Sequence, residues 1–63
     1  MNKTYPVSIV ICALNEELRI KDTIESAKNN HPAEIIVVEG GSTDKTFEIA
    51  SKYADHVIST KKF

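Results

Sequence analysis

The residues best suited to chemistry in this chain stand together at positions 39–44, where the sequence reads EGGSTD. A carboxylate such as that of Glu39 can accept two hydrogen bonds from ribose hydroxyls, or one from a base N–H. The two glycines allow a ligand or another backbone segment to approach closely. The Ser-Thr pair that follows can open a helix, whose free N–H groups attract negative groups. The same six residues also suit a plain strand-to-helix turn, so spacing alone leaves both interpretations open.

A second polar segment, residues 12–17 (CALNEE), follows an apolar run. Cys12 falls within that run and has no evident base partner, so we expect an inert buried thiol rather than a nucleophile. Glu16 and Glu17 are adjacent and would diverge by about 100° on a helix, which does not suit a paired-carboxylate catalytic set. We expect them to place negative charge at a helix start, although Glu16 could also face a ligand.

Composition excludes several classes of function. The chain has 63 residues, a net charge of −1 and one cysteine, which gives no electrostatic footprint for nucleic acid and no intrachain disulfide. His31 and His56 lack metal-ligand spacing, so no metal site is expected. No apolar run approaches the ~20 residues that span a bilayer, and we expect a cytoplasmic location. Neither a P-loop motif nor a G-x-G-x-x-G after the first strand is present.

Three short apolar runs predict strands at residues 7–14, 33–38 and 56–60. The first two are continuous and rich in β-branched residues, which is typical of parallel strands covered on both faces. Pro6 would lie just ahead of the first strand, where no ladder donor is needed.

Helical patterns separate these strands. In the first helix Asn15 should be the N-cap and Ile20, Ile24 and Ala27 the inner face, while Asn29 or Asn30 adopts a left-handed cap before Pro32. In the second helix Ser42 or Thr43 should be the cap and Asp44 part of the first turn. Its inner face should contain Phe47, Ala50 and Ala54, with Ile49 and Tyr53 alongside, and Asp55 should end it.

The predicted fold class is therefore α/β: a βαβαβ half of a doubly wound, Rossmann-like parallel sheet with three strands and two helices. In such sheets ligands bind at the carboxyl ends of the strands, where residues 12–17 and 39–44 fall.

Together, VSIVICALNEE and EIIVVEGGSTDKT resemble the N-terminus of glycosyltransferase family 2, enzymes of the GT-A fold, and the likeness extends over residues 7–60. The resemblance implies binding of a nucleotide diphosphate-sugar. Two positions depart from the family pattern. Cys12 replaces the usual proline, which a strand end tolerates, and Glu39 replaces the usual aspartate with a side chain one methylene longer, which bears on nucleotide affinity or preference. The residues that match the nucleotide site are Cys12, Ala13, Leu14 and Glu16 in the first segment, and Glu39, Gly40, Gly41 and Ser42 in the second.

The family's D-x-D metal motif and its acidic general base have no counterpart among Asp22, Asp44 and Asp55. The resemblance implies a divalent cation, Mg²⁺ or Mn²⁺, for a full-length member. We therefore expect residues 1–63 to be the incomplete N-terminal part of a GT-A domain. By itself this part should be inactive, and its parent should transfer a sugar to a hydroxyl acceptor and could be membrane-associated.

Two alternatives remain. One is a stand-alone half-Rossmann binding or interaction module without catalysis. The other is a nucleotidyltransferase, although the glycine-rich basic loop usual after its first strand is absent. In any of these cases, the uncovered edges and uncovered apolar face of a three-stranded half-sheet predict self-association or poor stability.

Overall fold

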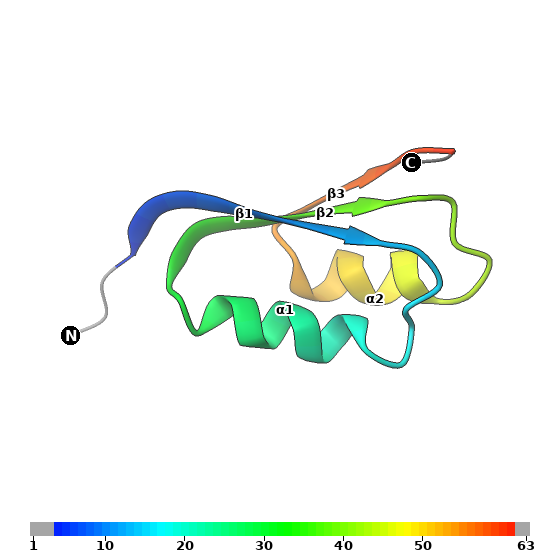
Figure 1. Ribbon diagram of the computed structural model, residues 1–63, viewed down its shortest axis with the longest axis horizontal. Helices are drawn as coiled ribbons and strands as arrows, with labels where there is room; N and C mark the ends of the chain where they lie inside the picture. The colour runs from blue at the N-terminus through cyan, green and yellow to red at the C-terminus, as the bar shows by residue number, and fades with distance from the viewer. Residues whose placement is uncertain (1–3, 62–63) are drawn as a thin grey trace.

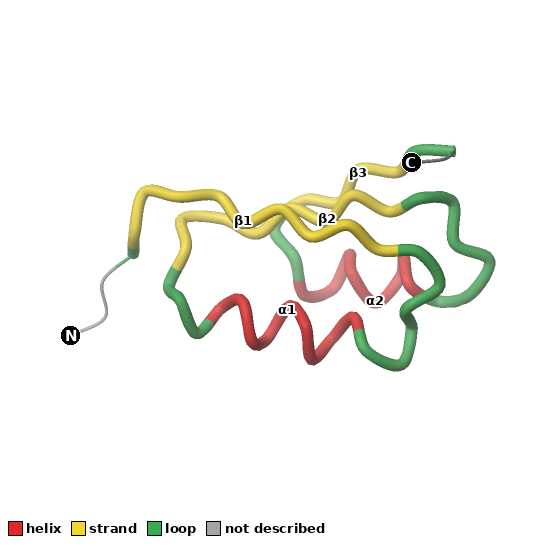
Figure 2. Tube along the Cα trace, viewed as in Figure 1, coloured by secondary structure: helices red, strands yellow, loops and turns green. Residues whose placement is uncertain are grey.

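The computed structural model describes residues 4–61, which form three strands and two helices in strict alternation (Figures 1 and 2). The elements are β1 (Tyr5–Ala13), α1 (Ile20–Lys28), β2 (Pro32–Glu39), α2 (Thr46–Tyr53) and β3 (His56–Ser59). The predicted β-α-β-α-β order and the α/β class are confirmed. Pro6 lies inside β1 rather than ahead of it, at a point where the pairing with β2 shifts register between Tyr5 and Ser8.

The sheet is parallel throughout, with β2 between β1 and β3. Ala13 of β1 pairs with Glu39 of β2, which in turn pairs with Ser59 of β3. The carboxyl ends of all three strands therefore lie at the same level. Both helices cover one face of this sheet (Figure 1). The loops after β1 and β2 lie side by side because these two strands are adjacent and parallel.

The core lies between the sheet and the two helices. Ile20 and Ile24 of α1 pack against Ile35 and Val37 of β2, and all four are buried. The predicted inner face of α1 is thus confirmed, with Ala27 half-buried at its end. These apolar side chains hold α1 against the strand that carries Glu39 at its end.

The inner face of α2 differs from the prediction at one position. Thr46 and Ala50, four residues apart, are fully buried, whereas Phe47 is 45% exposed. Because the helix starts at Thr46, the i, i+4 pair Thr46 and Ala50 faces the sheet, and Phe47 lies about 100° away from it. Ile49, Tyr53 and Ala54 are half-buried at the edge of the core.

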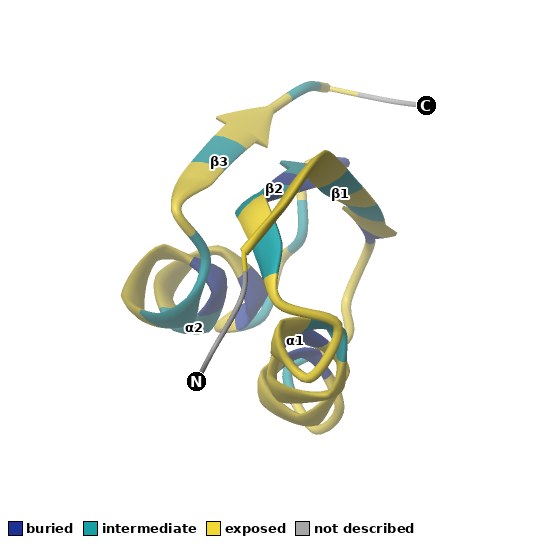
Figure 3. Ribbon diagram, turned by 90° about the vertical axis from the view of Figure 1, so that its left-hand side faces the viewer, coloured by how far each residue is buried: buried dark blue, intermediate teal, exposed yellow. Residues whose placement is uncertain are grey.

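The opposite face of the sheet has no covering layer within residues 4–61, so the prediction of strands buried on both faces is wrong (Figure 3). Val10 and Ile58 are 58% and 54% exposed, and Cys12 is exposed rather than buried. The physical reason is that both crossovers place their helices on the same side. Apolar side chains that alternate outward along the strands then have nothing packed on them.

The ends of α1 also differ from the prediction. The helix begins at Ile20, and Asn15 is not its N-cap but has a left-handed backbone with φ 50°. A turn precedes the helix, in which the Glu16 carbonyl accepts hydrogen bonds from the N–H groups of Arg19 and Ile20. At the other end His31, with φ 51°, takes the left-handed conformation expected of Asn29 or Asn30.

The connection from α2 to β3 is fixed by one residue. The helix ends at Tyr53, and the Asp55 carboxylate accepts a hydrogen bond of 2.7 Å from the Ile35 N–H. The Asp55 N–H donates in return to the Ile35 carbonyl at 3.0 Å. This pair of hydrogen bonds positions the start of β3 beside β2. Neither helix in residues 4–61 has the length and apolar character that a membrane crossing requires.

Candidate functional site

The candidate site is the carboxyl edge of the sheet, where residues 14–19 and 40–45 form two neighbouring loops (Figure 1). In parallel sheets this edge is the usual place for a ligand. The first contact between the loops is a hydrogen bond of 2.9 Å from the Gly40 N–H to the Ala13 carbonyl. The edge thus brings together the two segments that the sequence singled out.

Three consecutive backbone N–H groups of the first loop donate hydrogen bonds to side-chain oxygens that come from the second loop and the start of α2. The pairs are Asn15 to Ser42 Oγ (2.9 Å), Glu16 to Thr46 Oγ1 (2.8 Å) and Glu17 to Asp44 Oδ2 (3.2 Å). These side chains therefore satisfy the N–H groups of residues 15–17, which would have no partner inside a helix that started at Asn15.

Two hydrogen bonds run in the opposite direction. The Thr43 N–H donates to Asn15 Oδ1 at 2.8 Å, and the Lys45 N–H donates to Glu17 Oε1 at 3.1 Å. We call these five hydrogen bonds, four between the loops and one from the first loop to Thr46 of α2, the interlock. The predicted capping role of Ser42 and Thr43 is wrong, because both residues bond to Asn15 instead.

Asp44 connects the interlock to α2. Its Oδ1 accepts hydrogen bonds from both the hydroxyl and the N–H of Thr46, the latter at 2.9 Å, so Asp44 stands just before the helix rather than in its first turn. The Thr46 hydroxyl, the Thr46 N–H and the Glu17 N–H lower the pKa of Asp44, in that order of effect, against the opposing effect of burial. The carboxylate is therefore held ionised at the helix start, where the helix dipole also favours it.

Glu39 is buried, with only 3% of its surface exposed. One carboxylate oxygen accepts a hydrogen bond from the Ser42 N–H, and the other accepts one from the Ser59 hydroxyl at 3.1 Å. The backbone and side chain of Ser42, then Ser59 and the Gly41 N–H, lower the pKa of Glu39, while burial acts in the opposite direction. The carboxylate thus closes its own loop onto the end of β3, and its contact with a ribose stays a prediction.

Gly41 meets a backbone requirement of the second loop. Its φ of +85° lies in the left-handed region that side chains disfavour, and a Cβ there would lie 3.4 Å from the carbonyl oxygens of Thr60 and Lys61. Gly40 is buried beside it. The glycines therefore allow a tight turn beside the end of β3. A strand-to-helix turn was one of the two interpretations of EGGSTD.

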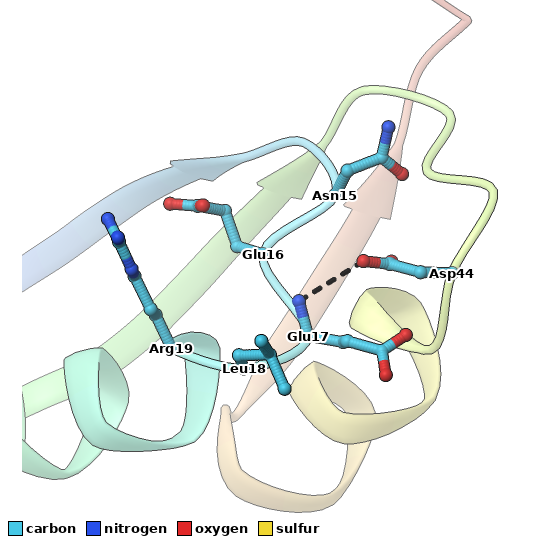
Figure 4. Close-up of a pocket in the computed structure, with 6 residues that line it drawn as sticks. All are labelled: Asn15, Glu16, Glu17, Leu18, Arg19 and Asp44. Carbon is cyan, nitrogen blue, oxygen red and sulfur yellow. Dashed lines mark hydrogen bonds between the residues drawn. The ribbon is translucent and has the colours of Figure 1, made fainter.

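A cleft of about 420 Å³ opens beside the interlock (Figure 4). Its lining residues are Asn15, Glu16, Glu17, Leu18, Arg19 and Asp44. Of the eight predicted nucleotide-binding residues, only Glu16 lines this cleft; Cys12 lies on the open face, Ala13 is buried, Leu14 is 48% exposed, and residues 39–42 form the neighbouring turn.

The two segments that the sequence named, residues 12–17 and 39–44, supply four of the six lining residues, but only Glu16 among these four was predicted to bind nucleotide. Asn15 and Glu17 were assigned to the start of a helix, and Arg19 was not singled out. The sequence did contain one indication of a loop. CALNEE lies several positions ahead of Ile20, the first apolar residue of the helical period, which leaves room for a loop. The partners of that loop lie 27 to 30 positions further along the chain, where no local pattern indicates them.

The cleft is acidic with one cation. Glu16, Glu17 and Asp44 contribute carboxylates, and Arg19 contributes a guanidinium group. Both oxygens of Asp44 and one of Glu17 already accept hydrogen bonds. Within residues 4–61 no three acidic, histidine or cysteine side chains are grouped so that they could hold a metal ion.

Comparison with known proteins gives one family. The sequence model described as "Glycosyl transferase family 2" matches residues 8–62. An uncharacterized protein of Methanocaldococcus jannaschii is 44% identical over 46 residues, which cover 73% of this chain and 19% of that protein. A cholesterol galactosyltransferase of Borreliella burgdorferi is 38% identical over 61 residues, which cover 94% of this chain and 17% of that protein. The chain thus spans less than a fifth of the length of these curated relatives. No solved structure matches it.

Proposed function

Because the chain belongs to glycosyltransferase family 2, we propose that it forms the nucleotide-recognising part of an enzyme that transfers a sugar from a nucleotide diphosphate-sugar to a hydroxyl acceptor. The name of the Borreliella relative gives galactose as the sugar and cholesterol as the acceptor of that protein, which supports a hexosyltransferase with a hydroxyl acceptor. We also propose that residues 1–63 correspond to the N-terminal part of a GT-A domain.

The observation that carries this proposal is the interlock. Its five hydrogen bonds join the first motif loop to the second loop and to the start of α2 at the carboxyl edge of the sheet, next to an open cleft. A ligand that enters there does not have to order the loops, so less conformational entropy is lost on binding. A plain strand-to-helix turn would not need partners in a second loop.

The chain's own chemical part is to bind and orient the donor nucleotide. The proposed nucleotide-binding set remains Cys12, Ala13, Leu14, Glu16, Glu39, Gly40, Gly41 and Ser42. Glu39 has lone pairs left for a ribose hydroxyl beyond its bonds to Ser42 and Ser59. Because only 3% of the Glu39 surface is exposed, a ligand must come close to the sheet edge to reach its carboxylate.

The divalent cation, Mg²⁺ or Mn²⁺, that the family implies does not fit residues 4–61. These residues offer no group of three metal-binding side chains, and the cleft's Asp44 already binds the N–H groups of Glu17 and Thr46. The family's acidic general base for the acceptor likewise has no counterpart among Asp22, Asp44 and Asp55. We therefore expect this chain by itself to bind nucleotide without transferring sugar.

The proposal is tested by calorimetric titration of the chain with uridine diphosphate and guanosine diphosphate. Saturable binding of at least one of them, weakened in Glu39→Gln while circular dichroism shows the fold retained, is the expected result. The control is Glu25→Gln, which removes an exposed carboxylate on α1. If the folded chain binds neither nucleotide, the alternative of an interaction module without catalysis is favoured, and the exposed apolar face of the sheet supplies its surface.

A further inference from the structure

The carboxylate of Glu39 is held by hydrogen bonds from two separate elements. One oxygen accepts from the Ser42 N–H in the loop after β2, and the other accepts from the Ser59 hydroxyl of β3 at 3.1 Å. The sheet register explains the second contact, because Glu39 and Ser59 are paired residues on adjacent parallel strands. Ser59 lies outside both motif segments, 20 positions after Glu39.

Burial of Glu39 makes the bond from Ser59 different from a contact at the surface. Only 3% of Glu39 is exposed, and a carboxylate that leaves water needs hydrogen-bond donors for its oxygens. A donor at each oxygen also selects one orientation of a side chain that has several rotamers. After the backbone and side chain of Ser42, the Ser59 hydroxyl lowers the pKa of Glu39 further, against the opposing effect of burial.

We infer that Ser59 is a positioning residue of the nucleotide site, whose hydroxyl holds Glu39 in the orientation in which its carboxylate meets the ligand. Ser59 acts through Glu39 rather than by touching the nucleotide. This inference rests on the proposed function and adds to it a residue of β3, a four-residue strand at the edge of the sheet. Because coupling between two equilibria is reciprocal, a ligand bound to Glu39 also strengthens the attachment of β3.

A second serine–glutamate pair provides a matched comparison at the other end of the sheet. Ser8 of β1 donates a hydrogen bond of 2.6 Å to the Glu34 carboxylate of β2, near the amino end of these two adjacent strands. This bond also joins neighbouring strands, but it lies away from the motif loops. Both serines are exposed, so a valine can replace either of them without entering the core.

The test compares Ser59→Val with Ser59→Thr, which have nearly the same shape and differ in whether they carry a hydroxyl. Both side chains are β-branched and suit a strand. Ser8→Val is the control. Calorimetric titration measures binding of uridine diphosphate and guanosine diphosphate, NMR of the Glu39 carboxyl carbon follows its protonation in the free chain, and circular dichroism checks the fold.

The expected result depends on the hydroxyl alone. Ser59→Val should weaken binding of whichever diphosphate the wild-type chain binds by roughly three- to tenfold, because Glu39 loses one donor and its fixed orientation. The pKa of Glu39 should rise above its wild-type value, since one bond that favours the ionised form is gone. Ser59→Thr should keep both properties close to those of the wild type, and Ser8→Val should change neither.

Other results overturn the assignment in distinguishable ways. If Ser59→Val binds the diphosphate as tightly as Ser59→Thr, Ser59 does not position Glu39 and the proposed function stands. Equal weakening in Ser59→Val and Ser8→Val also overturns the assignment, since any lost bond between strands would then have the same effect. A folded wild-type chain that binds neither diphosphate contradicts the assignment and the proposed function together.

A measurement on the wild-type chain decides the matter if Ser59→Val does not fold. Hydrogen exchange of the β3 amides is followed with and without the diphosphate. Binding should slow this exchange, because the ligand, Glu39 and Ser59 are coupled. Exchange in β3 that is unchanged by bound diphosphate contradicts the assignment.

Discussion

Asn15 and Thr43 stand 28 positions apart in the chain, yet the Thr43 N–H donates a hydrogen bond of 2.8 Å to the side-chain oxygen of Asn15. The Asn15 N–H in turn donates to the hydroxyl of Ser42 at 2.9 Å. Asn15 therefore holds the loop after β2 with both its side chain and its backbone. The left-handed backbone of Asn15, with φ 50°, turns its N–H group and its side chain toward the same loop.

The first prediction concerns this residue. Asn15→Ala should lower the free energy of unfolding by about 1–2 kcal/mol, because the Thr43 N–H loses its partner and alanine disfavours a positive φ. Asn15→Gly keeps the backbone conformation and should be less destabilised. Urea denaturation measures both, with Asn29→Ala as the control because Asn29 has an ordinary φ of −65° and an exposed side chain. Equal losses in Asn15→Ala and Asn29→Ala would contradict the role of Asn15.

The second prediction concerns the buried hydroxyl of Thr46, which accepts a hydrogen bond from the Glu16 N–H at 2.8 Å and donates one to Asp44. Thr46→Val keeps the shape but leaves the Glu16 N–H unpaired, so the free energy of unfolding should fall by about 1–3 kcal/mol. Thr46→Ser retains the hydroxyl and should recover most of this loss. Thr23→Val, on the exposed side of α1, is the matched control for the same chemical change. A valine variant that loses no more stability than Thr23→Val would contradict the role of the hydroxyl, and a serine variant as unstable as the valine variant would show that the methyl group also contributes.

The third prediction is a pH dependence. Hydrogen bonds from Ser42 and Ser59 lower the pKa of Glu39 in the folded chain below its ordinary value of 4.5. The ionised carboxylate therefore stabilises the fold fully above 4.5, and this contribution is lost as the pH falls through the lowered pKa. Glu39→Gln should be less stable than the wild-type chain at pH 7, and the difference should shrink as the pH falls below 4.5. Chemical denaturation of both proteins across pH 2–7 measures this, and a difference that stays constant with pH would contradict it.

The fourth prediction concerns Gly41, whose φ is +85°. Gly41→Ala should lower the free energy of unfolding by about 1–2 kcal/mol, because the left-handed conformation is strained for alanine. The new Cβ would also lie 3.4 Å from the carbonyl oxygens of Thr60 and Lys61. Gly41→Asn should cost less, since asparagine tolerates this region better. Thermal unfolding ranks the three proteins, and an alanine variant as stable as the wild type would exclude strain at this turn.

The fifth prediction tests the proposed self-association through the open face of the sheet. Val10 is 58% exposed on that face and belongs to no core cluster. Val10→Lys should therefore shift the chain toward monomer in sedimentation velocity at micromolar concentration and change stability little. Leu18→Lys makes the same change at a residue that is 90% exposed away from the sheet, and it should leave the oligomeric state unaltered. A wild-type chain that is a stable monomer would contradict the proposal.

The sequence by itself determined the order of elements, the parallel sheet and the edge that carries the site. The recurrence of Ile20 and Ile24 fixes which side of α1 is apolar, and burial of both residues follows from that local period. Ala13 and Glu39 end two strands joined by a helical crossover. Parallel strands joined in this way have their carboxyl ends on one side, so the two motif segments had to meet.

Only the tertiary structure decided what those segments do with their polar groups and which face of the sheet is covered. The apolar run along β1 is nearly continuous, so the sequence makes both Ile11 and Cys12 plausible core residues. Cys12 is exposed only because both helices pack on the other side. Asn15 bonds to Thr43 rather than capping α1 because folding brings the second loop within hydrogen-bond distance of it. Periodicity shows which side chains are apolar, but contacts between residues 27 to 30 positions apart depend on how the helices and the sheet pack. That packing places Glu17 and Asp44 in the interlock, while Glu16 and Arg19 line the cleft.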